Sequence, residues 1–161
     1  MTAEHLTKRD TEWVGKARVV GDNGETTFVI ELLDRLPGYY HIEPKPKKIK
    51  LFTGGKGIRL DTKITNTLTG EVLFVEKKTG NNGGNAHERV YKYISPALKR
   101  RVSEMYNTPA NPFFLVFSGK TFQKQKYREE CELLLEGEEY AIIEEGFKNM
   151  DAIADQIMEI I

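Results

Sequence analysis

Residues 112–117 form an unbroken apolar run, Pro-Phe-Phe-Leu-Val-Phe, that ends at Ser118-Gly119. The short length of the run and its aromatic and β-branched side chains favour a strand. A strand without polar alternation is typical of a sheet that is covered on both faces. We therefore expect a fold in which helices pack against both sides of a central sheet.

Helical and strand-like segments alternate along the rest of the chain. The apolar spacing predicts helices over residues 26–36, 85–93, 95–106, 124–136 and 149–161. It predicts strands over residues 39–42, 58–65, 71–78 and 140–143, and residues 66–70 have a composition typical of a turn. The length of 161 residues suits one core. We therefore predict a single α/β domain over residues 1–161, with a central mixed sheet flanked by helices.

The composition is that of a soluble globular protein, with 39% hydrophobic and 30% charged residues. There is no apolar run long enough to span a membrane and no secretion leader, so we expect a cytoplasmic protein with no membrane partner. A single cysteine, Cys131, excludes an internal disulfide and a cysteine-based zinc site. We expect Cys131 to pack in the core.

Charge is distributed unevenly along a chain whose net charge is zero. Residues 41–101 contain 14 Lys and Arg against 5 Asp and Glu, whereas residues 129–161 contain 1 against 11. Such segregation indicates a basic face, and affinity for duplex DNA depends on lysine and arginine meeting phosphates. The acidic region would then face away from DNA or meet a partner. A mixed, solvated surface is the alternative interpretation.

Lysines and arginines at two places are candidates for contact with the DNA backbone. Pro44 and Pro46 lack an N–H donor, so the segment from 44 to 48 is predicted to be an exposed basic loop or arm. The candidate phosphate contacts are Lys45, Lys47, Lys48, Lys99 and Arg100. Simple solubility is the alternative role.

Glu76 and Lys78 are two residues apart in a predicted strand, so their side chains leave the same face of the sheet. Burying both charges beside apolar neighbours is costly unless each has a partner or a task. Asp61, on the preceding predicted strand, can supply a second carboxylate. Two carboxylates suit Mg²⁺, which can polarise a scissile phosphate and activate water while Lys78 stabilises the developing charge. A surface salt-bridge pair is the alternative.

Asn85, Glu88 and Arg89 follow a glycine-rich segment and stand at i, i+3 and i+4 of a predicted helix. These three side chains can read base edges in the major groove, since asparagine pairs with adenine, glutamate accepts from an exocyclic amine, and arginine donates to ring acceptors. An asparagine-capped helix with a Glu–Arg surface pair is the alternative.

Four motifs occur in the order found in one known family. They are Phe74-Val75-Glu76-Lys77-Lys78, Gly84-Asn85-Ala86-His87-Glu88-Arg89, Ser95-Pro96-Ala97-Leu98 and the segment from Pro112 to Gly119. These motifs lie in a matching stretch that runs from roughly Tyr39 to Gly119, about half of the chain. On them the sequence resembles the EcoRI/MunI-like type II restriction endonucleases of the PD-(D/E)xK superfamily.

The resemblance implies a restriction-endonuclease-like fold and a Mg²⁺-dependent enzyme that cuts double-stranded DNA and leaves 5′-phosphates. Its metal-dependent cleavage centre falls on Asp61, Glu76 and Lys78, with Asp61 and Glu76 as the metal ligands. The role of reading an AATT-like core falls on Asn85, Glu88 and Arg89. Leu60 and Gly83 depart from the family motif, and the Gly83 departure leaves the outer base pair open.

Alternatives remain for the partner and for the activity. The chain is shorter than the homodimeric enzymes that it resembles, so it is either a homodimer or a small catalytic subunit that pairs with a larger endonuclease subunit, as in BsrDI and BtsI. A DNA-binding protein that has lost cleavage is a second function class, and a structure-specific repair nuclease of the same fold is a third. The complete Asp61, Glu76 and Lys78 set argues against the former, and the base-reading residues argue against the latter.

Overall fold

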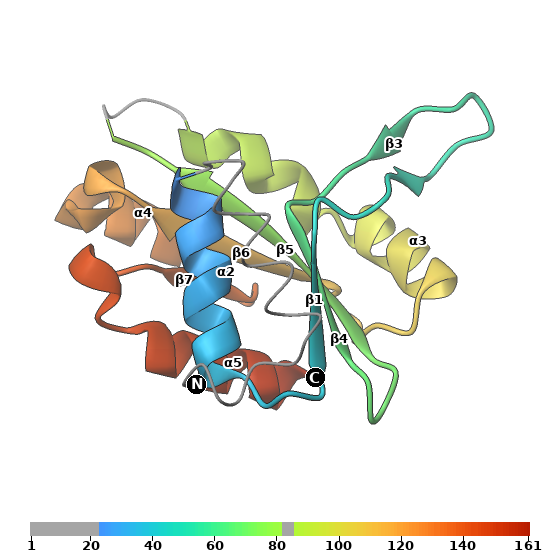
Figure 1. Ribbon diagram of the computed structural model, residues 1–161. Coiled ribbons are helices and arrows are strands. Elements are labelled where there is room, and N and C mark those ends of the chain that lie inside the picture. The colour runs from blue at the N-terminus through green and yellow to red at the C-terminus, as the bar shows by residue number, and fades with distance from the viewer. Residues whose placement is uncertain (1–22, 82–85) are drawn as a thin grey trace.

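The computed structural model describes residues 23–81 and 86–161, and a five-stranded sheet lies at its centre (Figure 1). The strands, in spatial order, are β1 (Tyr40–Pro44), β4 (Thr62–Asn66), β5 (Val72–Thr79), β6 (Phe113–Ser118) and β7 (Tyr140–Ile142). β4 pairs antiparallel with both β1 and β5, whereas β6 pairs parallel with both β5 and β7. The prediction of a central mixed sheet is confirmed.

Helices cover both faces of this sheet. On one face lie α2 (Asn23–Arg35) and α5 (Met150–Ile160), and α5 is preceded by the short 3₁₀ helix η4 (Glu145–Phe147). The opposite face carries the 3₁₀ helices η2 (Ala86–Ile94) and η3 (Lys120–Gln123) with the α-helices α3 (Pro96–Met105) and α4 (Gln125–Leu134). Each layer has its own apolar cluster, so the sheet is packed between two cores.

Strand β6 is buried along its whole length, as its apolar sequence predicts. Phe114 and Val116 pack in the cluster with α2 and α5, whereas Phe113, Leu115 and Phe117 pack in the cluster with η2, α3 and α4. Alternating side chains of one strand therefore join the two cores, which explains why the run has no polar positions.

The boundaries predicted for the second strand are wrong. In place of a continuous strand over 58–65, the chain forms a short β3 (Gly57–Ile58) and then the separate strand β4. β3 pairs antiparallel with β2 (Ile49–Lys50) in a two-stranded hairpin outside the main sheet. An apolar pattern cannot reveal this break, because Leu60 between the two strands is as buried as a strand residue.

The segment after β1 leaves the sheet one residue later than predicted. Pro44 still stands opposite Thr62 as the last residue of β1. β1 is an edge strand, where the missing N–H of a proline leaves no ladder hydrogen bond unmade. Lys45, Lys47 and Lys48 are exposed, as predicted for the segment from 44 to 48.

Three other local predictions can be compared with the structure. We predicted a helix over 85–93, and residues 86–94 form one, of the 3₁₀ type. Ser95 caps α3, as predicted, and its Oγ accepts a hydrogen bond from the Leu98 N–H at 3.3 Å. Cys131 is buried, as predicted. Within residues 23–81 and 86–161, no helix has both the length and the apolar character needed to cross a lipid bilayer.

Leu73 and Leu68 provide a matched test of the core. Leu73 in β5 is fully buried, whereas Leu68 in the turn before β5 is 73% exposed. We predict that Leu73→Ala lowers the free energy of unfolding by about 2–5 kcal/mol, because it removes buried contacts and leaves a cavity. Leu68→Ala should change that free energy by less than about 0.5 kcal/mol. Urea unfolding measures both, and equal losses would contradict this packing.

Candidate active site

The carboxylate of Asp61 is held against the middle of β5 by a backbone hydrogen bond. Pairing between β4 and β5 ends at Thr62 opposite Val75. One residue before β4, the Asp61 Oδ2 accepts a hydrogen bond from the Lys77 backbone N–H at 2.8 Å. The Asp61 carboxylate therefore takes the place that a strand partner would occupy, beside the Glu76–Lys78 segment.

Glu76 and Lys78 leave the same face of β5, as the two-residue spacing predicts. The Lys78 Nζ lies 3.5 Å from the Glu76 Oε1. Glu76 is buried, with only 6% of its surface exposed, whereas the Lys78 side chain is 29% exposed. Glu76 thus forms the floor of the site, and Lys78 leads from it toward solvent.

The surroundings of the Glu76 carboxyl disfavour its charged form. The pKa of Glu76 is raised from 4.5 to about 7. Burial is the main cause and the nearby charge of Asp61 adds to it, whereas Lys78 and Lys92 lower the pKa. The Glu76 Oε2 is buried and forms no hydrogen bond within the described part of the chain. A buried carboxylate oxygen without a donor, next to a second carboxylate, favours the presence of a cation.

The site meets the needs of a magnesium ion. Mg²⁺ typically binds through one or two carboxylates and completes its coordination with waters and substrate phosphate oxygens. Asp61 and Glu76 provide two carboxylates, and one oxygen of Glu76 is free to act as a ligand. Among the described residues, no group of three or more His, Cys, Asp or Glu side chains is placed to hold one metal ion, so a site closed entirely by side chains is not formed there.

The predicted base-reading residues can be placed only in part. Asn85 and the side chain of Arg89 lie outside the described residues. Glu88 is exposed on η2. Val90 and Tyr93 anchor η2 by packing in the apolar cluster on the active-site face of the sheet. Because this anchoring holds η2 next to β5, Glu88 is presented from an element close to Glu76 and Lys78.

Lys92 and Tyr93 belong to the surroundings of the site, although the sequence analysis did not select them. The exposed Lys92 ammonium lowers the pKa of Glu76, which places its charge within electrostatic reach of the carboxylates. Burial raises the pKa of the Tyr93 hydroxyl, and the charges of Glu76 and Asp61 raise it further. A lysine and a tyrosine in a helix with an amphipathic pattern resemble ordinary surface and core residues, so the sequence contained no clear signal for either.

The predicted phosphate contacts differ in their surroundings. Lys45, Lys47, Lys48 and Arg100 are exposed. Lys99 instead donates to both carboxylate oxygens of Glu138, and each of these two side chains is only 15% exposed. An ammonium already paired in this way is less available for a DNA phosphate.

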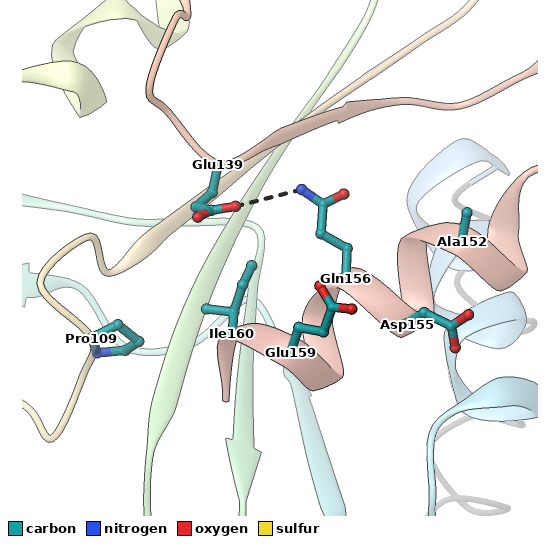
Figure 2. Close-up of a pocket in the computed structure, with 7 residues that line it drawn as sticks. All are labelled: Pro109, Glu139, Ala152, Asp155, Gln156, Glu159 and Ile160. Atoms are coloured by element: carbon teal, nitrogen blue, oxygen red, sulfur yellow. Dashed lines mark hydrogen bonds between the residues drawn. The ribbon is translucent and has the colours of Figure 1, made fainter.

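A separate hollow of about 720 Å³ lies along α5, the helix that covers the other face of the sheet (Figure 2). It includes the three acidic residues Glu139, Asp155 and Glu159. In Figure 2 the Gln156 amide reaches toward Glu139, at a donor–acceptor distance of 3.5 Å. This hollow contains none of the predicted site residues, and its acidic lining is unsuited to DNA phosphates.

Comparisons with known proteins identify the family and the fold. The family model described as type II restriction enzyme MunI matches residues 41–142, a range that includes Asp61, Glu76 and Lys78. Among solved structures, the chain is similar to the MunI restriction endonuclease in its crystal structure with cognate DNA, with a TM-score of 0.68 and 18% sequence identity. The similarity covers 91% of this chain and 92% of that chain. No curated protein sequence matches the chain.

The buried Glu76 should make the metal-free protein less stable at high pH. The pKa of Glu76 is raised in the folded state, so the folded protein prefers the neutral carboxyl. The contribution of Glu76 to the free energy of unfolding is therefore most favourable below about pH 4.5 and falls as the pH rises to about 7. Each pKa unit corresponds to about 1.4 kcal/mol, so we predict that Glu76→Gln raises the free energy of unfolding at pH 8 in EDTA by about 2 kcal/mol.

The same variant should respond differently to Mg²⁺. Adding Mg²⁺ at pH 8 should raise the melting temperature of the wild-type protein, because the ion binds the folded state, and should have little effect on Glu76→Gln. Glu136→Gln, a change at an exposed carboxylate, serves as the control and should behave like wild type. A Glu76→Gln variant that is no more stable than wild type at pH 8 would contradict the raised pKa of Glu76 in the folded protein.

Proposed function

The chain belongs to the family of the type II restriction enzyme MunI, whose members are endonucleases that cut DNA at specific sequences, and we propose that it requires Mg²⁺ and cuts double-stranded DNA at a site with an AATT-like or AT-rich core. The main support for the cleavage chemistry is the meeting of Asp61 and Glu76 beside Lys78. We propose 5′-phosphate products and a cytoplasmic location, following the family resemblance.

Each of the three side chains has a distinct part in the proposed reaction. Asp61 and Glu76 would hold the divalent ion, whose contribution is to polarise the scissile phosphate and to activate water. Lys78 ends in a partly exposed ammonium that can approach a phosphate oxygen and stabilise the negative charge that grows there during hydrolysis. The buried position of Glu76 restricts water around these groups, which strengthens each electrostatic interaction.

Sequence recognition is proposed for Asn85, Glu88 and Arg89. The support is the Gly-Asn-Ala-His-Glu-Arg motif and the position of η2, which is the next element after β5 and lies in contact with it. Because the base-reading residues and the cleaving residues lie on adjacent elements, the cut can occur at a fixed distance from the recognised bases. For the DNA backbone we propose the exposed Lys45, Lys47, Lys48 and Arg100, and we leave out Lys99 because it pairs with Glu138.

The proposed partner, besides DNA, is a second copy of this chain. A two-fold homodimer places two active sites on the two strands of a palindromic sequence. A larger endonuclease subunit is the alternative, which the short length of the chain suggested. The comparison with the MunI structure covers 91% of this chain and 92% of that chain, so length gives little support to this alternative.

Incubation of the purified protein with plasmid DNA and Mg²⁺ tests the proposed activity. Discrete linear fragments support the homodimeric endonuclease, whereas nicked circles alone support a subunit that cuts one strand. Binding without any cleavage would favour a DNA-binding protein, and cleavage confined to branched or damaged DNA would favour a repair nuclease.

Lys78→Ala and Glu76→Ala separate cleavage from binding. We predict that each variant slows cleavage by at least about 10²-fold, because each loses a group that stabilises the transition state or the ion. Binding to the cleavage site, measured by mobility shift without Mg²⁺, should stay within about threefold of wild type. The exposed Lys126→Ala on α4 is the control and should leave both properties unchanged. Parallel loss of binding and cleavage would contradict these roles.

A further inference from the structure

A basic hairpin lies between β1 and Asp61, and its role is not explained by the cleavage site. We call residues 45–59 the basic arm. Its two strands pair through Ile49 opposite Ile58 and Lys50 opposite Gly57, in a small sheet separate from the main one. Figure 1 shows the arm extending from the body of the protein at the edge where β1 and β4 lie.

All the charge on the arm is positive. Residues 45–59 contain five lysines and one arginine and no acidic residue. Their exposed cations are Lys45, Lys47, Lys48, Lys50, Lys56 and Arg59. None of the six forms an ion pair with a carboxylate in residues 23–81 or 86–161. Six exposed cations on one projecting hairpin match the repeated phosphates of a nucleic-acid backbone.

The tip of the arm carries an unprotected aromatic ring. Phe52 is 71% exposed and belongs to neither apolar cluster. It is followed by the Thr53-Gly54-Gly55 turn, where Gly55 has a φ of +83° and no bulky neighbour. An exposed phenylalanine that lies between Lys50 and Lys56 in the sequence is suited to contact with bases and sugars, since apolar side chains insert into DNA grooves while cations hold the flanking phosphates.

The base of the arm is firmly attached next to the active site. Ile49, Leu51 and Leu60 are buried in the same cluster as Phe74 of β5. Gly57 allows the two strands of the arm to approach closely, because a Cβ there would lie 2.4 Å from the Ile49 carbonyl oxygen. The Lys45 N–H also donates to the Asp61 carbonyl oxygen at 2.8 Å. The arm is therefore held at a fixed position relative to Asp61.

We propose that the basic arm binds the DNA duplex outside the recognised base pairs, on the flank next to the scissile phosphate. Lys50, Lys56 and Arg59 contact the sugar–phosphate backbone, and Phe52 packs against sugars or base edges in a groove. The arm strengthens binding without reading sequence, because its contacts are to phosphates and to features common to all base pairs. The inference rests on the proposed function, since it requires duplex DNA as the substrate.

The test compares two arm variants with a matched control on a mixed-sequence 40-base-pair duplex without Mg²⁺. Lys50→Ala/Lys56→Ala should weaken binding about 10-fold and reduce the slope of log affinity against log salt by about 1.8, since each phosphate contact contributes about 0.9. Phe52→Ala should weaken binding about 5-fold with the slope unchanged, because no charge is lost. Lys126→Ala/Lys148→Ala removes two exposed charges far from the arm and should bind like wild type.

Duplex length provides a second measurement. On fragments that carry the cleavage site with progressively shorter flanks, the difference between wild type and the arm variants should disappear when the flank no longer reaches the arm. Unchanged melting temperatures would show that the exposed substitutions leave the fold intact.

Three outcomes would overturn the inference. If wild type binds and cuts DNA while the arm variants bind as tightly with the same salt slope, the arm is not a DNA contact and the proposed function stands. If the arm variants keep full DNA affinity but lose binding to anionic lipid vesicles, the arm serves a membrane surface. If wild type neither binds the duplex nor cuts plasmid, the proposed function fails together with the inference.

Discussion

The hydrogen bond from the Lys77 N–H to the Asp61 carboxylate is the contact on which the proposed active site depends. It brings an acidic residue from outside the strands to the side of Glu76, whose own carboxyl is already buried. The two like charges repel, and the pKa of Glu76 rises to about 7 as a result of burial and of this neighbour. Binding of a cation would relieve this repulsion. The unfavourable energy of placing two carboxylates side by side would therefore strengthen binding of the ion.

Such a site needs a rigid support, and the two apolar cores provide it. β5 contributes Leu73 and Val75 to one core and Val72 and Phe74 to the other, so the strand is fixed just before Glu76. The same core that packs beneath the site also holds η2, with the proposed base-reading residues, and the base of the basic arm. Cleavage, recognition and grip on the flanking DNA are thereby proposed to share one support, which keeps their relative positions constant.

The sequence allowed good prediction of the features that depend on local periodicity. The common face of Glu76 and Lys78 follows from strand alternation, and the burial of β6 on both faces follows from its unbroken apolar run. Predictions failed where tertiary contacts decide the structure. The hairpin before Asp61 interrupts what looked like one strand, and the proximity of Lys92 to Glu76 depends on how η2 packs against the sheet. The raised pKa of Glu76 likewise depends on burial, which a sequence pattern does not quantify.

The central claim is that Asp61 and Glu76 together bind one divalent ion. Crystals grown with Mn²⁺ in place of Mg²⁺ test this most directly, because anomalous scattering locates the ion independently of the coordinates of the protein. Our account predicts an anomalous peak at coordination distance, about 2.1 Å, from oxygens of both Asp61 and Glu76. Absence of a peak there at saturating Mn²⁺, or a peak only at other carboxylates such as Glu144 and Glu145, would contradict it.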